Sequence, residues 1–354
     1  IKQFADGEIF VRIDRNARGR DVFIVQTTSA PAENILELLL LIDAARRASA
    51  ARVTAVIPYF GYGRQDRKDQ PRVAIGAKLV ANLMVAAGAD RVVSIDFHQH
   101  QIQGFFDIPV DHLYAAPVIT KYFRDKELED LVVVAPDVGS AKMARGYGKR
   151  LGASFAIIDK RRPKANQSEV LNVVGEVEGM NCLLVDDMVD TAGTLSNAVV
   201  ALKERGAKAV YAAATHALFS GPAVERLSSA PLEEMVVTNT IAIPEDKHFE
   251  NLTVLSVADL LAKSIDHVPP SILAEPVANI SSPAPAPRSP VISTVKVSVE
   301  SVSPVMVIGV PANVASAILM TLSPATGSSM VRAAAVASTV RAWVTSTGLP
   351  KPSS

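Results

Sequence analysis

The sequence predicts an α/β fold with two mainly parallel sheets and helices flanking each sheet. Three observations support this prediction. Apolar runs rich in Val and Ile alternate with segments of helical periodicity over the first 266 residues. Two strand–helix–strand units of the same length recur, one centred near residue 50 and one near residue 200. A chain of 354 residues is also long enough for about two domains of roughly 150 residues each.

The expected elements follow one another along the chain in strand–helix alternation. Short apolar runs are expected to form buried strands at Val22–Gln26, Val53–Pro58, Arg91–Asp96, Leu131–Ala135, Phe155–Asp159, Cys182–Asp186, Ala209–Thr215 and Glu234–Thr238. Segments with apolar residues at helical spacing are expected to form helices at Asn34–Ser49, Ala74–Ala87, Ala115–Phe123, Ser140–Leu151, Thr191–Arg205 and Ala223–Ser228. In such a fold, ligands are expected in the loops that follow the carboxyl ends of the strands.

Charge and proline content divide the chain into two unlike parts. Lys and Arg together number 36, as do Asp and Glu, so the formal net charge is zero. Residues 267–354, however, hold only seven charged residues and 12 of the 22 prolines. The first 266 residues therefore carry a net charge of −3 and the tail a net charge of +3. We place the boundary near Ile265 and expect the Pro-, Ser- and Ala-rich tail, residues 266–354, to be disordered.

Composition also limits the classes of function. A chain without a basic excess is not expected to bind nucleic acid, because displacing counterions from phosphates requires positive charge. The single cysteine, Cys182, excludes a disulfide framework and a Cys-rich metal site, and it fits a cytoplasmic protein in a reducing compartment. Residues 301–330 contain no charged residue, but prolines interrupt them, so we do not expect a membrane-spanning helix.

The segment Leu183–Thr194 carries the strongest chemical signal. A hydrophobic strand ends in two adjacent carboxylates, Asp186 and Asp187, and a loop of small residues then opens into a helix. Backbone N–H groups at the start of that helix predict an anion site, which Gly193 allows a phosphate to approach closely. Carboxylates beside a phosphate cradle suit a sugar phosphate. The simpler alternative is a helix capped by Asp190, but two acids at the end of an apolar strand favour the binding site.

This segment resembles the ribose-5-phosphate loop of the type I phosphoribosyltransferase fold. Several other segments resemble the ribose-phosphate pyrophosphokinases, and the similarity runs from Lys2 to Ile265; the segments are Arg64–Lys68, Ser94–Asp111, Lys160–Pro163, Thr215–Pro222 and Thr238–Ile241. The resemblance implies two tandem phosphoribosyltransferase-like domains, residues 1–115 and 116–265. It also implies an enzyme that transfers the pyrophosphoryl group of ATP to the 1-hydroxyl of ribose 5-phosphate, giving 5-phosphoribosyl 1-pyrophosphate and AMP for nucleotide biosynthesis.

The resemblance assigns roles to individual residues. It implies Lys160 and Arg162 as catalytic groups, Phe4, Asp6, Glu8, Arg64 and Gln65 as ATP contacts, Arg162, Asp186, Asp187, Asp190, Thr191, Ala192, Gly193 and Thr194 as ribose-5-phosphate contacts, and His98 and Asp137 as Mg²⁺ ligands. It further implies a homo-oligomer, a hexamer of dimers, regulated by phosphate and nucleoside diphosphates. Without the resemblance, the basic run at Lys160–Arg162 reads either as a solvated loop or as a flap that brings charge to the transition state.

The two ends of the similarity depart from the family. The family has a further strand and helix ahead of Lys2, so we expect the first half to lack a sheet strand and to expose apolar surface. Two alternative functions remain open. A non-catalytic regulatory subunit or inactive relative would assemble with active subunits. A phosphoribosyltransferase that consumes the activated sugar would explain the loop at Asp186–Thr194, but it would not explain Arg64, Gln65 or the run at Lys160–Arg162.

Overall fold

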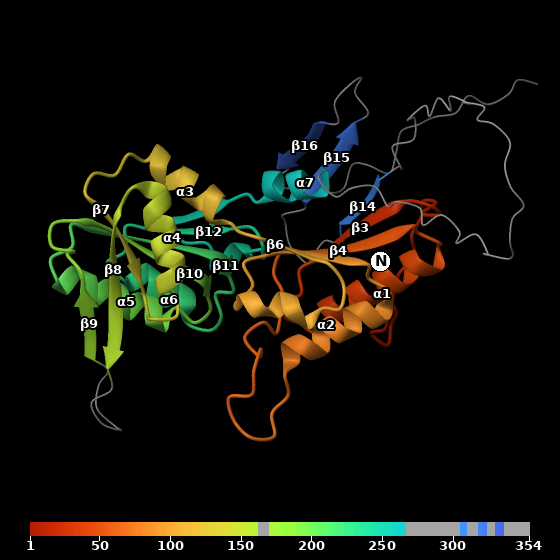
Figure 1. Ribbon diagram of the computed structural model, residues 1–354, viewed down its shortest axis with the longest axis horizontal. Coiled ribbons are helices and arrows are strands. Elements are labelled where there is room, and N and C mark those ends of the chain that lie inside the picture. The colour runs from red at the N-terminus through yellow and green to blue at the C-terminus, as the bar shows by residue number, and fades with distance from the viewer. Residues whose placement is uncertain (162–169, 267–304, 310–317, 324–329, 336–354) are drawn as a thin grey trace, which may run out of the picture.

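The computed structural model describes residues 1–161, 170–266, 305–309, 318–323 and 330–335. Two main sheets, each with helices against it, make up most of this part of the chain (Figure 1). The predicted α/β class with mainly parallel sheets is confirmed. All the strands and helices expected from the sequence are present, and their observed ends differ from the expected ones by at most three residues.

The first sheet is parallel throughout and has the strand order β14-β3-β4-β5-β6. Its strands are β3 (Asp21–Val25), β4 (Arg52–Ile57), β5 (Arg91–Ile95), β6 (Val110–Leu113) and β14 (Val305–Gly309). Its connections contain α1 (Glu33–Arg47), α2 (Gly76–Ala87) and the 3-10 helix η1 (His100–Phe105). Ahead of the sheet, β1 (Lys2–Gln3) and β2 (Ile9–Phe10) form a small antiparallel hairpin.

The second sheet has the order β13-β12-β11-β10-β7-β8-β9, and all of its pairs are parallel except β8 with β9. Its strands are β7 (Leu131–Ala135), β8 (Ser154–Arg161), β9 (Val170–Val174), β10 (Asn181–Val189), β11 (Ala209–Ala217), β12 (Glu234–Thr238) and β13 (Leu252–Leu255). The helices around it are α3 (Ala116–Asp125), α4 (Ala141–Leu151), α5 (Gly193–Glu204), α6 (Ala223–Ser229), the 3-10 helix η2 (Glu245–Lys247) and α7 (Ala258–Asp266).

A shared hydrophobic core joins the two sheets. One buried cluster contains Phe23 and Ile95 from the first sheet, Leu183 and Val236 from the second, and Leu261 from α7. Each sheet also has a separate cluster on its other face. Because fully buried apolar side chains from both sheets pack together, the carboxyl ends of their strands are held close enough to build one site.

The tail contributes a strand to the first sheet. In Figure 1, β14 lies beside β3, and Val305–Gly309 pairs in parallel with Asp21–Val25. β3 therefore has a neighbour on each side in the sheet, and every one of its residues is buried, although apolar surface was expected to be exposed in this half of the chain. Two more tail strands, β15 (Ile318–Ser323) and β16 (Met330–Ala335), pair with each other. The prediction of disorder covers residues 266–354, and apart from Asp266 and these three strands they lie outside the described residues.

The described part of the chain offers no candidate for a membrane span, since none of its helices is both long enough and apolar enough.

Candidate active site

A recess of about 400 Å³ lies where strand ends of the two sheets meet. Arg64 reaches it from the turn after β4, His98 from the loop after β5, and Asp137 from the loop after β7. Asp186 and Asp187 reach it from the carboxyl-terminal half of β10. Five of the residues predicted from the sequence, spread over 124 positions of the chain, are thus brought together at the place where parallel α/β sheets bind ligands.

His98 and Asp187 form a tight pair at the centre of the recess. The Nδ1–H of His98 donates a hydrogen bond to Oδ2 of Asp187 at 2.7 Å. This hydrogen bond raises the pKa of His98 above its usual value. Burial acts to raise the pKa of Asp187, but the hydrogen bond and charge of His98 prevail and lower it. Asp187 is therefore an ionised carboxylate, and its bond to Nδ1 leaves Nε2 of His98 as the nitrogen that can face a ligand.

The pKa of Asp186 shifts in the opposite direction. Burial, reinforced by the negative charge of Asp187, raises its pKa to about 7. The hydroxyl of Ser140 lies 3.1 Å from Oδ1 of Asp186 and 3.2 Å from Oδ1 of Asp137. It has one proton and can donate to only one of the two carboxylates at a time. Ser140 was not predicted from the sequence, although its position at the start of α4, three residues after Asp137, could have indicated it.

The acidic recess fits a magnesium ion that keeps much of its own water. In the described residues, no three His, Cys, Asp or Glu side chains converge as a metal cluster. Mg²⁺ usually takes only one or two carboxylates from a protein and completes its shell with water and substrate phosphates. The oxygen donors of Asp137 suit such an ion. His98 has the arrangement common in metal-binding histidines, in which the other ring nitrogen is bonded to a carboxylate.

The loop after β10 presents an uncapped helix start. Helix α5 begins at Gly193, and Ala192 stands at its N-cap with no side-chain hydrogen bond to the helix. Asp190 is therefore not the N-cap, so the simpler alternative for this segment is wrong. The first N–H groups of α5 have no side-chain cap, and such groups form a natural site for a phosphate. Thr191, Ala192, Gly193 and Thr194, which the sequence predicts as ribose-5-phosphate contacts, all line the recess.

Arg64 connects the two halves of the site. Its Nη1 lies 2.5 Å from Oδ2 of Asp190, across the boundary between the sheets. Burial acts to raise the pKa of Asp190, but hydrogen bonds from Ser220 and Arg64 lower it. The neighbouring Gln65 does not line the recess. A Cβ on Gly76 would lie 2.5 Å from Oε1 of Gln65, so the Gln65 side chain packs against the start of α2.

Other predicted residues lie apart from the recess or outside the described part of the chain. Phe4, Asp6 and Glu8 belong to the β1–β2 hairpin and do not line the recess of their own chain. Lys160 is at the end of β8, where its backbone pairs with Leu171 on β9. Arg162 lies outside the described residues.

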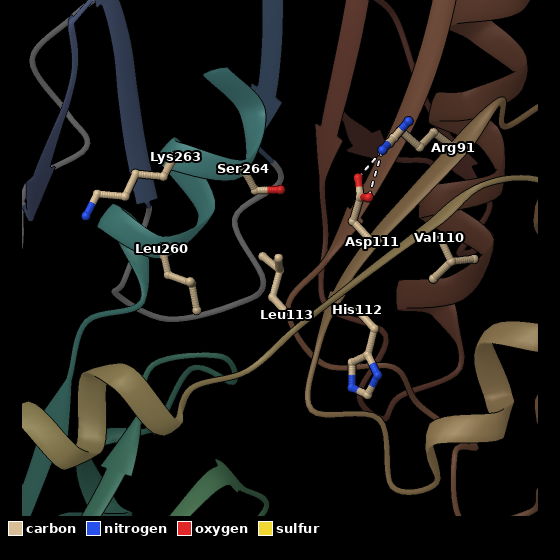
Figure 2. A pocket seen from close by; sticks show the side chains of 8 residues that line it. All are labelled: Arg91, Val110, Asp111, His112, Leu113, Leu260, Lys263 and Ser264. Carbon is tan, nitrogen blue, oxygen red and sulfur yellow. Dashed lines mark hydrogen bonds and ion pairs between the residues drawn. The ribbon is translucent and has the colours of Figure 1, made fainter. Parts of the chain in front are cut away.

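A second recess of about 470 Å³ opens between β6 and α7 (Figure 2). There the Arg91 guanidinium forms a bidentate ion pair with the Asp111 carboxylate, with N···O distances of 2.6 and 2.7 Å. Burial lowers the pKa of His112, which also lines this recess, to about 4, and the proximity of His100 contributes. This recess shares no lining residue with the first one, and it has neither the paired strand-end acids nor the uncapped loop.

Comparisons with known proteins identify the family of the chain. Residues 1–88 match the family model described as the N-terminal domain of ribose phosphate pyrophosphokinase. Residues 159–269 match the model described as the phosphoribosyl synthetase-associated domain. The ribose-phosphate pyrophosphokinase of Caldanaerobacter subterraneus subsp. tengcongensis is 56% identical over 267 residues, which cover 75% of this chain and 84% of that protein. The corresponding protein of Fusobacterium nucleatum is 52% identical over 271 residues, which cover 76% of this chain and 86% of that protein.

A solved structure extends the agreement to the fold. The phosphoribosylpyrophosphate synthetase from Mycobacterium smegmatis superposes with a TM-score of 0.70 and is 48% identical, covering 75% of this chain and 88% of that chain. The expected fold of two tandem phosphoribosyltransferase-like units is confirmed by this likeness. The chain belongs to the ribose-phosphate pyrophosphokinase family, whose members are diphosphotransferases.

Proposed function

We propose that this protein transfers the diphosphoryl group of ATP to the 1-hydroxyl of ribose 5-phosphate, giving 5-phosphoribosyl 1-pyrophosphate and AMP. The observation that carries the proposal is the contact between Arg64 and Asp190. It joins a residue expected to bind ATP to the loop expected to bind the sugar phosphate, so both substrates would meet in one recess. A phosphoribosyltransferase that consumes the activated sugar needs the loop but has no use for an ATP-binding arginine.

Ribose 5-phosphate would bind along the loop after β10. The free N–H groups at the start of α5 and the hydroxyls of Thr191 and Thr194 would hold the 5-phosphate. Asp187 is ionised and held by His98, so its carboxylate is oriented to accept hydrogen bonds from ring hydroxyls. Asp186 stands beside it on the same strand end. This arrangement fixes the sugar at both ends and leaves its 1-hydroxyl to face the ATP side of the recess.

In this reaction, the hydroxyl oxygen at carbon 1 of the sugar forms a bond to the β-phosphorus of ATP. The bond between the β-phosphorus and the oxygen that bridges it to the α-phosphate breaks. AMP leaves with that oxygen, and the hydroxyl proton is released. Negative charge shifts onto the departing AMP, so positive groups that meet it in the transition state accelerate the step. Arg64 lies in the recess. Lys160 and Arg162 would supply the rest, and His98 and Asp137 would hold Mg²⁺, which neutralises phosphate charge when bound.

The family resemblance supports further parts of the proposal. We expect a cytoplasmic homo-oligomer in which the hairpin of Phe4, Asp6 and Glu8 reaches the ATP site of a neighbouring subunit. That arrangement would account for the absence of these residues from the recess of their own chain. We expect phosphate and nucleoside diphosphates to regulate the assembly. The non-catalytic alternative has no observation in its favour.

An assay of AMP release tests the proposal. The purified protein, shown by circular dichroism to be folded, is incubated with ATP, Mg²⁺ and ribose 5-phosphate. AMP should appear only when all three are present. Lys160→Ala should lower kcat by at least about a hundredfold, as expected for loss of a group that acts on developing charge, and it should leave ribose 5-phosphate binding within about twofold. A folded parent protein that releases no AMP would overturn the proposal.

A further inference from the structure

Arg226 extends from α6 to the back of the loop that follows β10. Its Nη1 donates a hydrogen bond to the carbonyl oxygen of Thr191 at 2.9 Å. The same nitrogen would lie only 3.2 Å from a Cβ built on Gly193. The guanidinium therefore packs directly against the backbone of the loop, and a larger residue at position 193 would displace it.

This contact bears on phosphate binding through the geometry of one peptide group. In a trans peptide, the carbonyl of one residue and the N–H of the next lie in one plane and point in opposite directions. The Thr191 carbonyl and the Ala192 N–H form such a group. Holding the carbonyl toward Arg226 therefore turns the Ala192 N–H toward the other side of the loop. Ala192 has φ 58° and ψ 7°, a left-handed conformation that alanine seldom adopts without support.

The segment that carries Arg226 is itself firmly attached. Ala223 and Leu227 of α6 are fully buried in the core cluster beside α5. Just ahead of the helix, the N–H of Ser220 donates to the carbonyl oxygen of Asp190 at 2.9 Å. Two successive carbonyls of the loop are thus held by one rigid segment, Ser220–Arg226, which we call the outer brace.

The charge of Arg226 adds to this arrangement. Within the described residues, its side chain bonds to a neutral carbonyl and pairs with no carboxylate. An uncompensated positive charge therefore stands directly behind a loop whose other side offers N–H groups. Such a charge favours a phosphate dianion on that other side, and the attraction weakens as salt is added.

We propose that Arg226 is a positioning residue for the ribose-5-phosphate loop: it fixes the peptide between Thr191 and Ala192 and adds positive charge behind the phosphate, without touching either substrate. The inference rests on the proposed function, since that function assigns the loop to the 5-phosphate. It predicts that loss of Arg226 weakens the binding of one substrate and leaves the chemical step nearly unchanged.

The test compares Arg226→Ala and Arg226→Lys with a matched control, Arg205→Ala. Arg205 is exposed at the opposite end of α5, where its guanidinium bonds to Asn172 at 3.3 Å. We expect Arg226→Ala to raise the KM for ribose 5-phosphate, and the Kd measured by calorimetry without ATP, by about five- to twentyfold, as for loss of one charge-assisted hydrogen bond. The kcat and the KM for ATP should stay within about twofold, and Arg226→Lys should recover most of the affinity.

Three results would overturn the inference: an unchanged Kd for ribose 5-phosphate in Arg226→Ala, an equal loss in Arg205→Ala, or a fall in kcat together with a fall in Tm that the control does not show. The calorimetric arm separates this inference from the proposed function. If the parent binds ribose 5-phosphate but releases no AMP, the proposed function fails, and the binding data still decide the role of Arg226. If the parent does not bind ribose 5-phosphate at all, both fail.

Discussion

At the scale of single residues, two neighbouring acids of β10 have pKa values that shift in opposite directions. Asp187 has His98 as its partner, and its pKa falls. Burial and the negative charge of Asp187 raise the pKa of Asp186 to about 7. Holding two carboxylates side by side costs folding free energy, which a bound cation or sugar hydroxyls would offset. This conflict is characteristic of a functional site rather than of a structural one.

The repulsion between the Asp186 and Asp187 carboxylates predicts that Asp186→Asn raises the thermal stability of the protein at alkaline pH. The folded protein binds the Asp186 proton more tightly than the unfolded chain does, whose pKa is about 3.9. The favourable contribution of Asp186 is therefore full below about pH 4 and is lost as pH rises through 7. Without Mg²⁺ or substrates, Asp186→Asn should raise Tm at pH 8 by about 2–6 °C, and the gain should shrink toward pH 4.

Thermal unfolding at several pH values checks this prediction. Asp246→Asn is a suitable control, because it removes the same charge at an exposed position of η2. The account of Asp186 is wrong if its variant loses stability equally at every pH, or if the control shows the same pH-dependent gain.

At the scale of elements, the sequence predicted the long buried strands and the helices between them, and it missed several short elements. Long buried runs such as Leu131–Ala135 were identified with the observed ends, because parallel strands buried on both faces are continuously apolar. The short strands β6, β9 and β13 and the helix α7 were not predicted. β6 and β13 are each only four residues long, and their residues are partly buried or exposed, so they do not form the longer buried runs by which the other strands were recognised.

The candidate active site was also predicted only in part from residue types. Asp186, Asp187 and the loop after them were predicted from residue types alone, since acids at the end of an apolar strand are unusual. His98 and Asp137 were predicted only through the family resemblance, because a single polar residue after a strand carries little information. The contact between Arg64 and Asp190 could not be predicted, since it depends on how two sheets far apart in sequence pack together.

The turn after β4 gives a prediction at this scale. A Cβ on Gly61 would lie 2.0 Å from the carbonyl oxygen of Thr28, and the N–H of Gly61 donates to Oγ1 of Thr28 at 2.7 Å. No side chain fits without moving the backbone that positions Arg64. We expect Gly61→Ala to lower the free energy of unfolding by about 2–4 kcal/mol. Chemical denaturation measures this change.

Gly104→Ala is the matched control for that experiment. A Cβ on Gly104 meets nothing within 4 Å, and its backbone is not in the left-handed region. It should be neutral or stabilising by up to about 1 kcal/mol. Equal stability of the two variants would show that the turn yields to the extra carbon atom.

At the scale of the whole molecule, the site exists because the two sheets are held in one arrangement. Besides the shared core, a buried polar cluster joins them. Thr215 on β11 donates a hydrogen bond to Oδ2 of Asp96 at 2.6 Å, and Nε2 of His216 lies 3.0 Å from the Asp96 carbonyl oxygen. Asp96 follows β5 and stands two residues before His98. The contact between the sheets therefore reaches the segment that carries His98.

The pairing of β14 with β3 is a second contact between segments far apart in the chain. Adjacent N–H groups of an edge strand point to opposite sides, so only one of Val307 and Ile308 can donate to β3. Proline at the donating position removes this hydrogen bond, so it should lower Tm by several degrees more than proline at the other position. Each of the two variants is the control for the other. Two variants with the Tm of the parent would contradict this pairing.

The most direct measurement of the central claim follows a label on the γ-phosphate of ATP. A diphosphoryl transfer carries the β- and γ-phosphates together to the sugar. The label should therefore appear in 5-phosphoribosyl 1-pyrophosphate in equal amount to the AMP formed, and this should require ribose 5-phosphate. Label in free phosphate or in a sugar bisphosphate, with ADP as the other product, would contradict the claim.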